Sequence, residues 1–258
     1  MKNNKNSSIE QTFNQAIKYH ENKQLKLAEK IYIEIIKKNP KHIGALNNLG
    51  IIYFSIKKFD KSIKIFEKIS TIDANYLGAY NNLGLLFKQI GDYKKAIINL
   101  EKAIKINPKY FANYNNIGLV FYECEDYQKA IKNYEKAIEI NPDFFEAHNN
   151  LGLAFMKCGE YLKAIKNYEK AIKINPNYFV AYNNVALAFY ECGDYQKAIN
   201  NYKKAIEINP EYTRAYCNIG LAFEKTEEIN KAFNSYKKVP KSDSNYKYAQ
   251  YNIASLFY

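Results

Sequence analysis

The sequence FANYNNIGLVFYECEDYQKAIKNYEKAIEINPDF, at residues 111–144, decides the fold because nearly the whole chain consists of copies of it. The stretch at 179–212 is identical to it at about two thirds of its positions, and the same pattern returns at 77–110 and 145–178. Each copy is 34 residues long. A fixed period of about 20–50 residues is typical of proteins built from stacked structural repeats. We therefore expect an array that grows unit by unit and has no single central core.

Each copy contains two segments with helical periodicity. At about 100° per residue, each segment places four small or apolar residues on one helical face: Tyr114, Ile117, Gly118 and Phe121 in the first, and Ala130, Tyr134, Ala137 and Ile138 in the second. Asp126 is predicted to cap the second helix, and Asn141-Pro142 to end it. Small residues are expected to pack opposite bulky aromatic ones. The sequence thus predicts pairs of antiparallel helices.

Numbering each copy 1–34, as Phe111 to Phe144, gives a small residue at position 8, aromatic residues at 11 and 24, Ala at 20 and 27, and Pro at 32. This pattern resembles the tetratricopeptide repeat. The chain departs from the family by having Tyr or His at position 4, where Trp is frequent, and Ala186 at position 8. The resemblance implies an all-α solenoid, a right-handed superhelix of antiparallel helix pairs whose first helices line a concave groove. It also implies a partner-binding scaffold rather than an enzyme.

The resemblance extends over residues 9–258. We expect seven repeats at 9–42, 43–76, 77–110, 111–144, 145–178, 179–212 and 213–246. Residues 1–8 are predicted to form a disordered tail, and 247–258 the first helix of an incomplete eighth repeat. Pro240 is expected to end the second helix of the seventh repeat early.

Asparagine and leucine recur on the first-helix face predicted to line the groove. An amide both donates and accepts hydrogen bonds, so a row of amides could hold the backbone of an extended peptide whatever its side chains. The predicted peptide-binding residues are Asn48, Asn82, Asn116, Asn150, Asn184 and Asn218 at position 6, Asn81, Asn115, Asn149 and Asn183 at position 5, and Leu85, Leu119, Leu153 and Leu187 at position 9.

The asparagine row resembles the asparagine ladder in the repeat region of O-linked N-acetylglucosamine transferases, although the chain has no counterpart of their catalytic part. The alternative is that asparagine at position 6 is common throughout the family, reinforced by a composition rich in residues with A/T-rich codons.

Arg214 could bind a carboxylate with two hydrogen bonds, or it is simply a solvated surface residue. The residues of the family's carboxylate clamp for chaperone tails are missing.

The formal net charge of +12 raises the question of nucleic acid. Arg214 is the only arginine, however, and the predicted groove carries Glu10, Glu21, Glu123, Glu146 and Glu191 against Lys157, Lys225 and Arg214. The lysines concentrate on the second helices. Since nucleic-acid affinity comes largely from clustered cations, nucleic acid is an unlikely partner for the groove.

No catalytic motif, metal-ligand spacing or cofactor signature stands out in the sequence. Cys124, Cys158 and Cys192 are one repeat apart and are interpreted as reduced packing residues, with Cys217 facing the groove. Residues 1–12 lack the apolar block of a secretory signal, and no apolar window is long enough to span a membrane. We therefore expect a cytoplasmic, non-catalytic protein without cofactor or metal.

Two functions follow from the sequence. The first is a scaffold that holds an extended protein segment in the Asn/Leu-lined groove. The alternative is the substrate-docking module of a glycosyltransferase-type system whose catalytic part is on another chain. The apolar residues Ile253, Ala254, Leu256, Phe257 and Tyr258 also predict self-association through 246–258, unless this helix packs against repeat seven.

Overall fold

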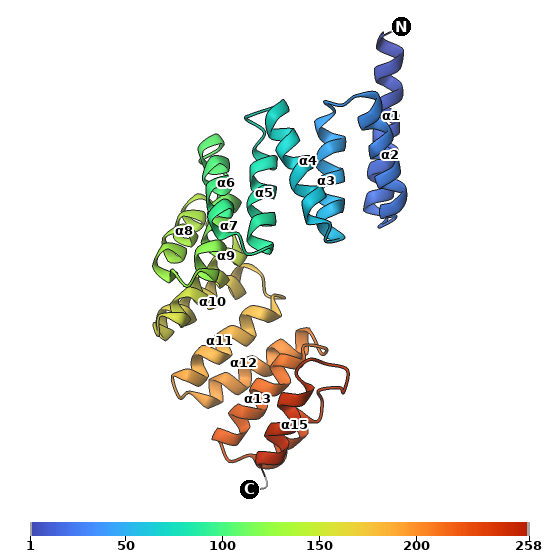
Figure 1. The fold of residues 1–258 in the computed structure, drawn as a ribbon. Coiled ribbons are helices and arrows are strands. Elements are labelled where there is room, and N and C mark those ends of the chain that lie inside the picture. Colours follow the sequence, from blue (N-terminus) through green and yellow to red (C-terminus); the bar gives the residue numbers. More distant parts are fainter. Residues whose placement is uncertain (1, 257–258) are drawn as a thin grey trace. The chain divides into compact units, whose positions relative to one another are not determined.

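The computed structural model describes the backbone of residues 2–256 and the side chains of residues 9–256. This part of the chain forms 15 helices and no strand, in two compact units, 1–120 and 121–258, that meet within helix α7 (Figure 1). Unit 1 contains α1 (Lys2–Glu21), α2 (Leu25–Lys38), α3 (Ile43–Ser55), α4 (Phe59–Ile72), α5 (Leu77–Gln89), α6 (Tyr93–Ile106) and most of α7 (Phe111–Glu123). Unit 2 continues with α8 (Tyr127–Ile140), α9 (Phe145–Lys157), α10 (Tyr161–Ile174), α11 (Phe179–Glu191), α12 (Tyr195–Ile208), α13 (Thr213–Lys225), α14 (Ile229–Tyr236) and α15 (Tyr246–Ser255).

Within each unit, the first and second helices of a repeat pack against each other, and each second helix packs against the first helix of the next repeat. First helices of successive repeats also touch, as α9 with α11 and α11 with α13 in unit 2. Each repeat thus shares its apolar surface with its neighbours, which is how a solenoid buries a continuous core. The predicted all-α solenoid of helix pairs is confirmed.

The two helices of a repeat approach closely where the first one carries glycine at position 8. A Cβ atom on Gly84 would lie 2.5 Å from Leu100, and one on Gly152 would lie 2.6 Å from Tyr168. Both neighbouring side chains are completely buried. The predicted packing of small against bulky residues is therefore confirmed, and it fixes the distance between the paired helices.

Every described turn between the two helices of a repeat uses a left-handed residue at position 15. Three repeats have glycine there, with φ of 81° at Gly91, 75° at Gly159 and 79° at Gly193. The other repeats place a lysine or glutamate in the same conformation, for example Glu125 with φ of 60°. Because this conformation is unfavourable for residues with a Cβ atom, the helix pairing around the turn holds the backbone in place.

Aspartate caps the second helix in three repeats. The Asp126 carboxylate accepts a hydrogen bond of 3.2 Å from the backbone N–H of Lys129 and pairs with the Lys129 ammonium at 2.8 Å, as the sequence predicted. Asp92 and Asp194 make the same two contacts. These hydrogen bonds and lysine charges lower the pKa of all three carboxyls.

The lowered pKa values predict that acid destabilises the fold. The caps contribute fully above the pKa of an unfolded aspartate, about 4, and their contribution is lost as the pH falls through the lower folded-state pKa. Thermal unfolding followed by circular dichroism should show a lower midpoint at about pH 3 than near neutrality. A variant with Asp92, Asp126 and Asp194 all changed to Asn keeps an acceptor that does not titrate and should show a smaller drop. An equal drop in both proteins would contradict this role of the caps.

The structure describes residues 2–8 at one end of the array and α14 near the other. The predicted disordered tail is wrong for the backbone of residues 2–8, which continues α1. No Gly or Pro interrupts residues 2–21, and extending an existing helix costs far less than nucleating one. At the other end α14 spans only 8 residues, against 14 in α12, so the early stop before Pro240 is confirmed.

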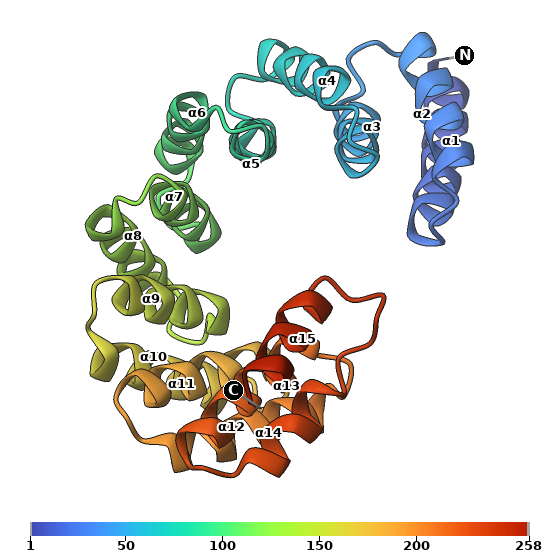
Figure 2. The same cartoon turned by 60° about the horizontal axis from the view of Figure 1, so that its bottom comes forward.

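The last described helix, α15, packs one face on repeat seven and leaves Tyr248 and Tyr251 exposed on the other. Ile253 and Leu256 are partly buried against a cluster that includes Ile219 and Phe223, and α15 lies beside α13 in both views (Figures 1 and 2). The expectation of uncovered Ile253 and Leu256 side chains is thus corrected; Phe257 and Tyr258 lie outside the described residues. Self-association through 246–258 stays a prediction.

One buried polar side chain has no partner in the core of unit 1. Asn113 is completely buried, and neither its amide nitrogen nor its amide oxygen has a hydrogen-bond partner. Five other repeats have a completely buried alanine at this position 3, namely Ala45, Ala79, Ala147, Ala181 and Ala215. An unsatisfied buried polar group typically costs about 1–3 kcal/mol.

We therefore expect Asn113→Ala to raise the free energy of unfolding, measured by urea titration, by about 1–3 kcal/mol. The reverse substitution Ala147→Asn, at the same position of repeat five, should lower it. If Asn113→Ala left the stability unchanged, the amide would have to be hydrated.

Candidate peptide-binding site

The position-6 asparagines hydrogen-bond to the preceding repeat. In unit 1 the side-chain nitrogen of Asn82 donates to the Asn47 oxygen at 3.4 Å, and that of Asn116 to Asn81 at 2.8 Å. In unit 2 Asn184 donates to Asn149 at 2.9 Å, and Asn218 to Asn183 at 3.0 Å. We call these bonds from position 6 to position 5 of the preceding repeat the asparagine ladder. It holds successive first helices at a fixed register.

The ladder places the position-5 amides inside the array. Asn149 and Asn183 are each 2% exposed, and Asn115 is 7% exposed. Asn183 also donates to Asn184 at 3.3 Å, so Asn218, Asn183, Asn184 and Asn149 form one connected network. From the sequence alone, position 5 is expected to contact a peptide directly. The structure corrects this for Asn115, Asn149 and Asn183, because their side chains are buried between the helices.

The position-6 side chains are half-buried and present one edge toward solvent: Asn48, Asn82, Asn116, Asn150, Asn184 and Asn218. The position-9 leucines are half-buried in the same way: Leu85, Leu119, Leu153 and Leu187. Since an Asn amide nitrogen carries two hydrogens, a ladder bond from Asn184 or Asn218 leaves one N–H for another acceptor.

At its first junction the ladder has no acceptor, because repeat one has Phe13 at position 5. Asn48 instead donates to the hydroxyl of Tyr32 at 3.1 Å. Tyr32 occupies position 24 of the preceding second helix. The tyrosine hydroxyl is therefore an alternative acceptor for a position-6 amide.

At its last junction the ladder meets a cysteine. Cys217 occupies position 5 of repeat seven and is 2% exposed, so the expectation that it faces the groove is wrong. Burial raises the pKa of its thiol to about 11. The position-6 residue that follows, Asn252, is 5% exposed, and its side-chain nitrogen has no hydrogen-bond partner.

Replacing Cys217 by Asn should supply the missing acceptor. We expect Cys217→Asn to stabilise the docking of α15 by about 0.5–1.5 kcal/mol, the net contribution of one hydrogen bond. Hydrogen exchange of the amides in 246–255 is the measurement, and they should be better protected in the variant. Cys217→Ala is the control and should give no such gain. Unchanged protection in both variants would show that Asn252 does not need a ladder partner.

Six of the predicted residues line one hollow in unit 2, with a volume of about 600 Å³. They are Leu153, Leu187, Asn183, Asn184, Asn218 and Arg214. The others are Tyr122, Met156, Lys157, Tyr161, Tyr168 and Glu191. Tyr161 and Tyr168 belong to a second helix, which analysis of the first-helix face alone could not include. Half of the twelve lining residues are charged residues or asparagines, and the rest are Leu, Met and Tyr, so the hollow offers both polar and apolar contacts.

Tyr168 contributes an unpartnered hydroxyl to this hollow. Its side chain is completely buried, and its oxygen has no hydrogen-bond partner. Burial strongly raises the pKa of the phenol, so it stays protonated and can donate. In the first junction the equivalent Tyr32 is satisfied by Asn48. Here Asn184 donates to Asn149 instead, which leaves Tyr168 without that partner.

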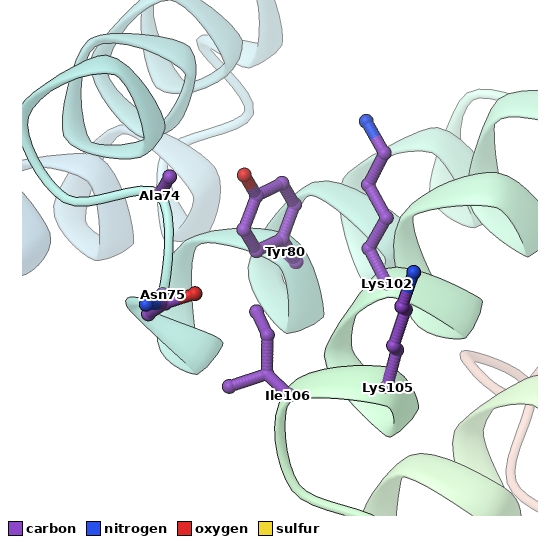
Figure 3. A pocket seen from close by; sticks show the side chains of 6 residues that line it. All are labelled: Ala74, Asn75, Tyr80, Lys102, Lys105 and Ile106. Carbon is purple, nitrogen blue, oxygen red and sulfur yellow. The ribbon is translucent and has the colours of Figure 1, made fainter.

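A second kind of hollow lies beside the turn between α4 and α5 in unit 1 (Figure 3). It measures about 590 Å³ and is lined by Tyr80, Ile106 and two lysines, Lys102 and Lys105. The corresponding hollow in unit 2 has Lys170 and Lys173 but also the acidic residue Asp143. These open surfaces carry the second-helix lysines noted in the sequence, away from the asparagine ladder.

The remaining sequence candidates are structural or exposed. His148, at position 4 of repeat five, is 3% exposed and its Nε2 lies 2.9 Å from the carbonyl oxygen of Pro142, which gives it a structural role. All four cysteines are free, but Cys124 and Cys192 are exposed, so the packing role expected for them is wrong. They follow the first helix, where the chain enters the turn to the second. No group of three His, Cys, Asp or Glu side chains in the described part is placed to hold a metal ion.

Comparisons with known families agree with this geometry. Models of the tetratricopeptide repeat match residues 41–109, 145–178, 167–200 and 213–246, and a TPR repeat model matches 118–159 and 186–227. The chain belongs to the tetratricopeptide-repeat family. The family assignment made from positions 8, 11, 20, 24, 27 and 32 is thereby confirmed. No curated protein matches this tetratricopeptide-repeat chain.

Solved structures share its fold. MamA is 30% identical with a TM-score of 0.57, over 63% of this chain and 88% of MamA. A tetratricopeptide-repeat protein from Parabacteroides merdae is 17% identical with a TM-score of 0.74, over 98% of this chain and all of that one. YrrB, described as a TPR protein with an unusual peptide-binding site, is 21% identical with a TM-score of 0.55, over 71% and 95% of the two chains. Among the described helices, none has the length and apolar character needed to cross a bilayer.

Proposed function

We propose that this tetratricopeptide-repeat protein is a scaffold that binds an extended segment of a partner protein in the groove lined by its first helices. The observation that carries the proposal is the hollow of unit 2, where Leu153, Leu187 and Arg214 from three successive repeats meet. Tyr, Met and Arg, which also line it, are residue types enriched at protein interfaces. YrrB, which shares the fold, is described as having a peptide-binding site.

The asparagine ladder supports this function indirectly. Its buried position-5 amides fix the first helices, and a preorganised surface loses less entropy when it binds. The contact surface itself consists of the position-9 leucines and the outer edges of the position-6 amides. This division differs from a ladder that grips the peptide with both asparagine rows.

Leu187 offers a direct test of the groove. Random peptides displayed on phage, about a dozen residues long, are selected on the wild-type protein, and the affinity of synthetic copies is measured by fluorescence anisotropy. Leu187→Glu should weaken binding at least tenfold, because a charge replaces apolar contact in the hollow. Leu162→Glu is the matched control, since Leu162 is 78% exposed and does not line the hollow.

Equal binding by wild type and Leu187→Glu would place the peptide elsewhere and refute the groove. Circular dichroism of both variants checks that they remain folded. If a natural ligand proves to be a substrate of a glycosyltransferase on another chain, the alternative of a substrate-docking module is supported.

A further inference from the structure

We propose that the hollow of unit 2 selects acidic peptide segments in which an Asp or Glu side chain lies next to a large apolar residue. This inference rests on the proposed peptide-binding function and names the chemistry of the ligand. It replaces the expectation that the groove reads only the peptide backbone. The reasons are the hydrogen-bonding groups of the hollow that remain unused, its uncompensated charges and its apolar wall.

The ladder engages most of the amide groups that line the hollow. Asn183 accepts from Asn218 and donates to Asn184, and Asn184 in turn donates to Asn149. These bonds stabilise the array, and the groups that form them are not available to a ligand. The second N–H of Asn184 and of Asn218 can still bind an acceptor of any kind, so it does not distinguish one ligand from another, and the choice of ligand falls to the other polar groups.

The most deeply placed of these groups is the Tyr168 hydroxyl, which is completely buried and has no partner. An isolated buried hydroxyl is unfavourable, and an acceptor group from a ligand would remove the penalty. As a protonated phenol it donates best to a negatively charged oxygen, because hydrogen bonds to ionised acceptors are the stronger ones. The bottom of the hollow thus favours a carboxylate.

Lys157 and Arg214 add positive charge at the rim. Among the described residues no carboxylate lies within 4 Å of either cation. The second-helix lysines contrast with this: Lys129, Lys163 and Lys197 each pair with an acid three residues away. Arg214 lies beside Tyr212, where its charge opposes the rise in the phenol's pKa that burial causes.

Glu191 is the only acidic residue among those that line the hollow, so two cations face one anion. A carboxylate from the ligand would balance this excess. Arg214 can hold it with two parallel hydrogen bonds, which a lysine cannot do. The charge of the lining residues is therefore complementary to an acidic segment.

Leu153, Met156 and Leu187 form the apolar part of the lining. These side chains are half-buried in the absence of a ligand, so a large apolar residue of the ligand would remove further apolar surface from water. The proposed carboxylate is that of an Asp or Glu side chain within a segment, not that of a chain terminus.

The test is a selection with the same phage-displayed random peptides, in which no peptide ends in a free carboxylate. Wild-type protein should enrich peptides with Asp or Glu beside Leu, Ile, Met or an aromatic residue. A double variant, Lys157→Glu with Arg214→Glu, should lose these peptides. Lys166→Glu with Lys170→Glu is the control, since it changes the net charge equally at exposed lysines that do not line this hollow.

Tyr168→Phe provides an independent measurement. It removes only the unpartnered hydroxyl, so the unfolding midpoint should be unchanged or higher, while affinity for a selected acidic peptide should fall about tenfold, the usual effect of losing one hydrogen bond to a charged group. Tyr32→Phe is the control; it removes the acceptor of Asn48 in unit 1 and should leave the affinity unchanged. Glu191→Gln should strengthen binding severalfold.

The two proposals fail in different ways. Peptides that depend on Leu187 but show no acidic enrichment, or that bind Tyr168→Phe and the Lys157/Arg214 variant as well as wild type, would overturn the acidic selection and leave the groove intact. Peptides that bind Leu187→Glu unchanged would overturn the groove itself. Loss of binding in the Lys166/Lys170 control as well would show that net charge, and not the hollow, attracts the peptides.

Discussion

Hydrogen bonds between buried asparagine side chains hold the first helices of this solenoid in register. Apolar packing is the main contact within a helix pair, because glycine at position 8 brings the partner helix's Phe, Leu or Tyr within contact distance. Such packing is tolerant of small slips between repeats. Hydrogen bonds between amides do not tolerate such slips, because a displaced donor and acceptor would both lose their partners in a low-dielectric interior. The 2.8–3.0 Å bonds at Asn116, Asn184 and Asn218 therefore set the spacing at which a ligand meets the groove.

Because of this constraint, the asparagines and the other groove residues have different roles. The buried asparagines stabilise the array, and in the proposed function the residues left at the surface, chiefly the position-9 leucines and the rim charges, bind the ligand. In unit 2 this arrangement leaves Tyr168 with an unsatisfied hydroxyl, because Asn184, the counterpart of the Asn48 that donates to Tyr32 in unit 1, donates to Asn149 instead. A locally unfavourable feature, such as this unsatisfied hydroxyl in a surface hollow, is common at functional sites, where a ligand can supply the missing partner.

Much of this structure was accessible from the sequence, because the repeat itself carries the information. The 34-residue period, the small-to-large pairing, the Asp126 cap and the stop before Pro240 all depend on local spacing and on residues with strong conformational preferences. What could not be predicted depends on neighbours far along the chain. Helical periodicity puts positions 5 and 6 on one face, but only the packing of the next repeat shows that Asn115, Asn149 and Asn183 at position 5 are buried while the position-6 asparagines are half-buried. Similarly, Tyr161 and Tyr168 reach the hollow from a second helix, and no stripe on the first helices could reveal them.

The ladder also has a direction. In each of its hydrogen bonds the donor lies one repeat after the acceptor. A unit from the middle of the chain brings one donor and one acceptor, so a gene duplication that copies it inserts a module that fits both neighbours. The first repeat, with Phe13, and the seventh, with Cys217, each lack the acceptor and would interrupt the ladder if copied inward. Duplication of an interior unit would thus preserve the ladder, which agrees with the close identity of 111–144 and 179–212.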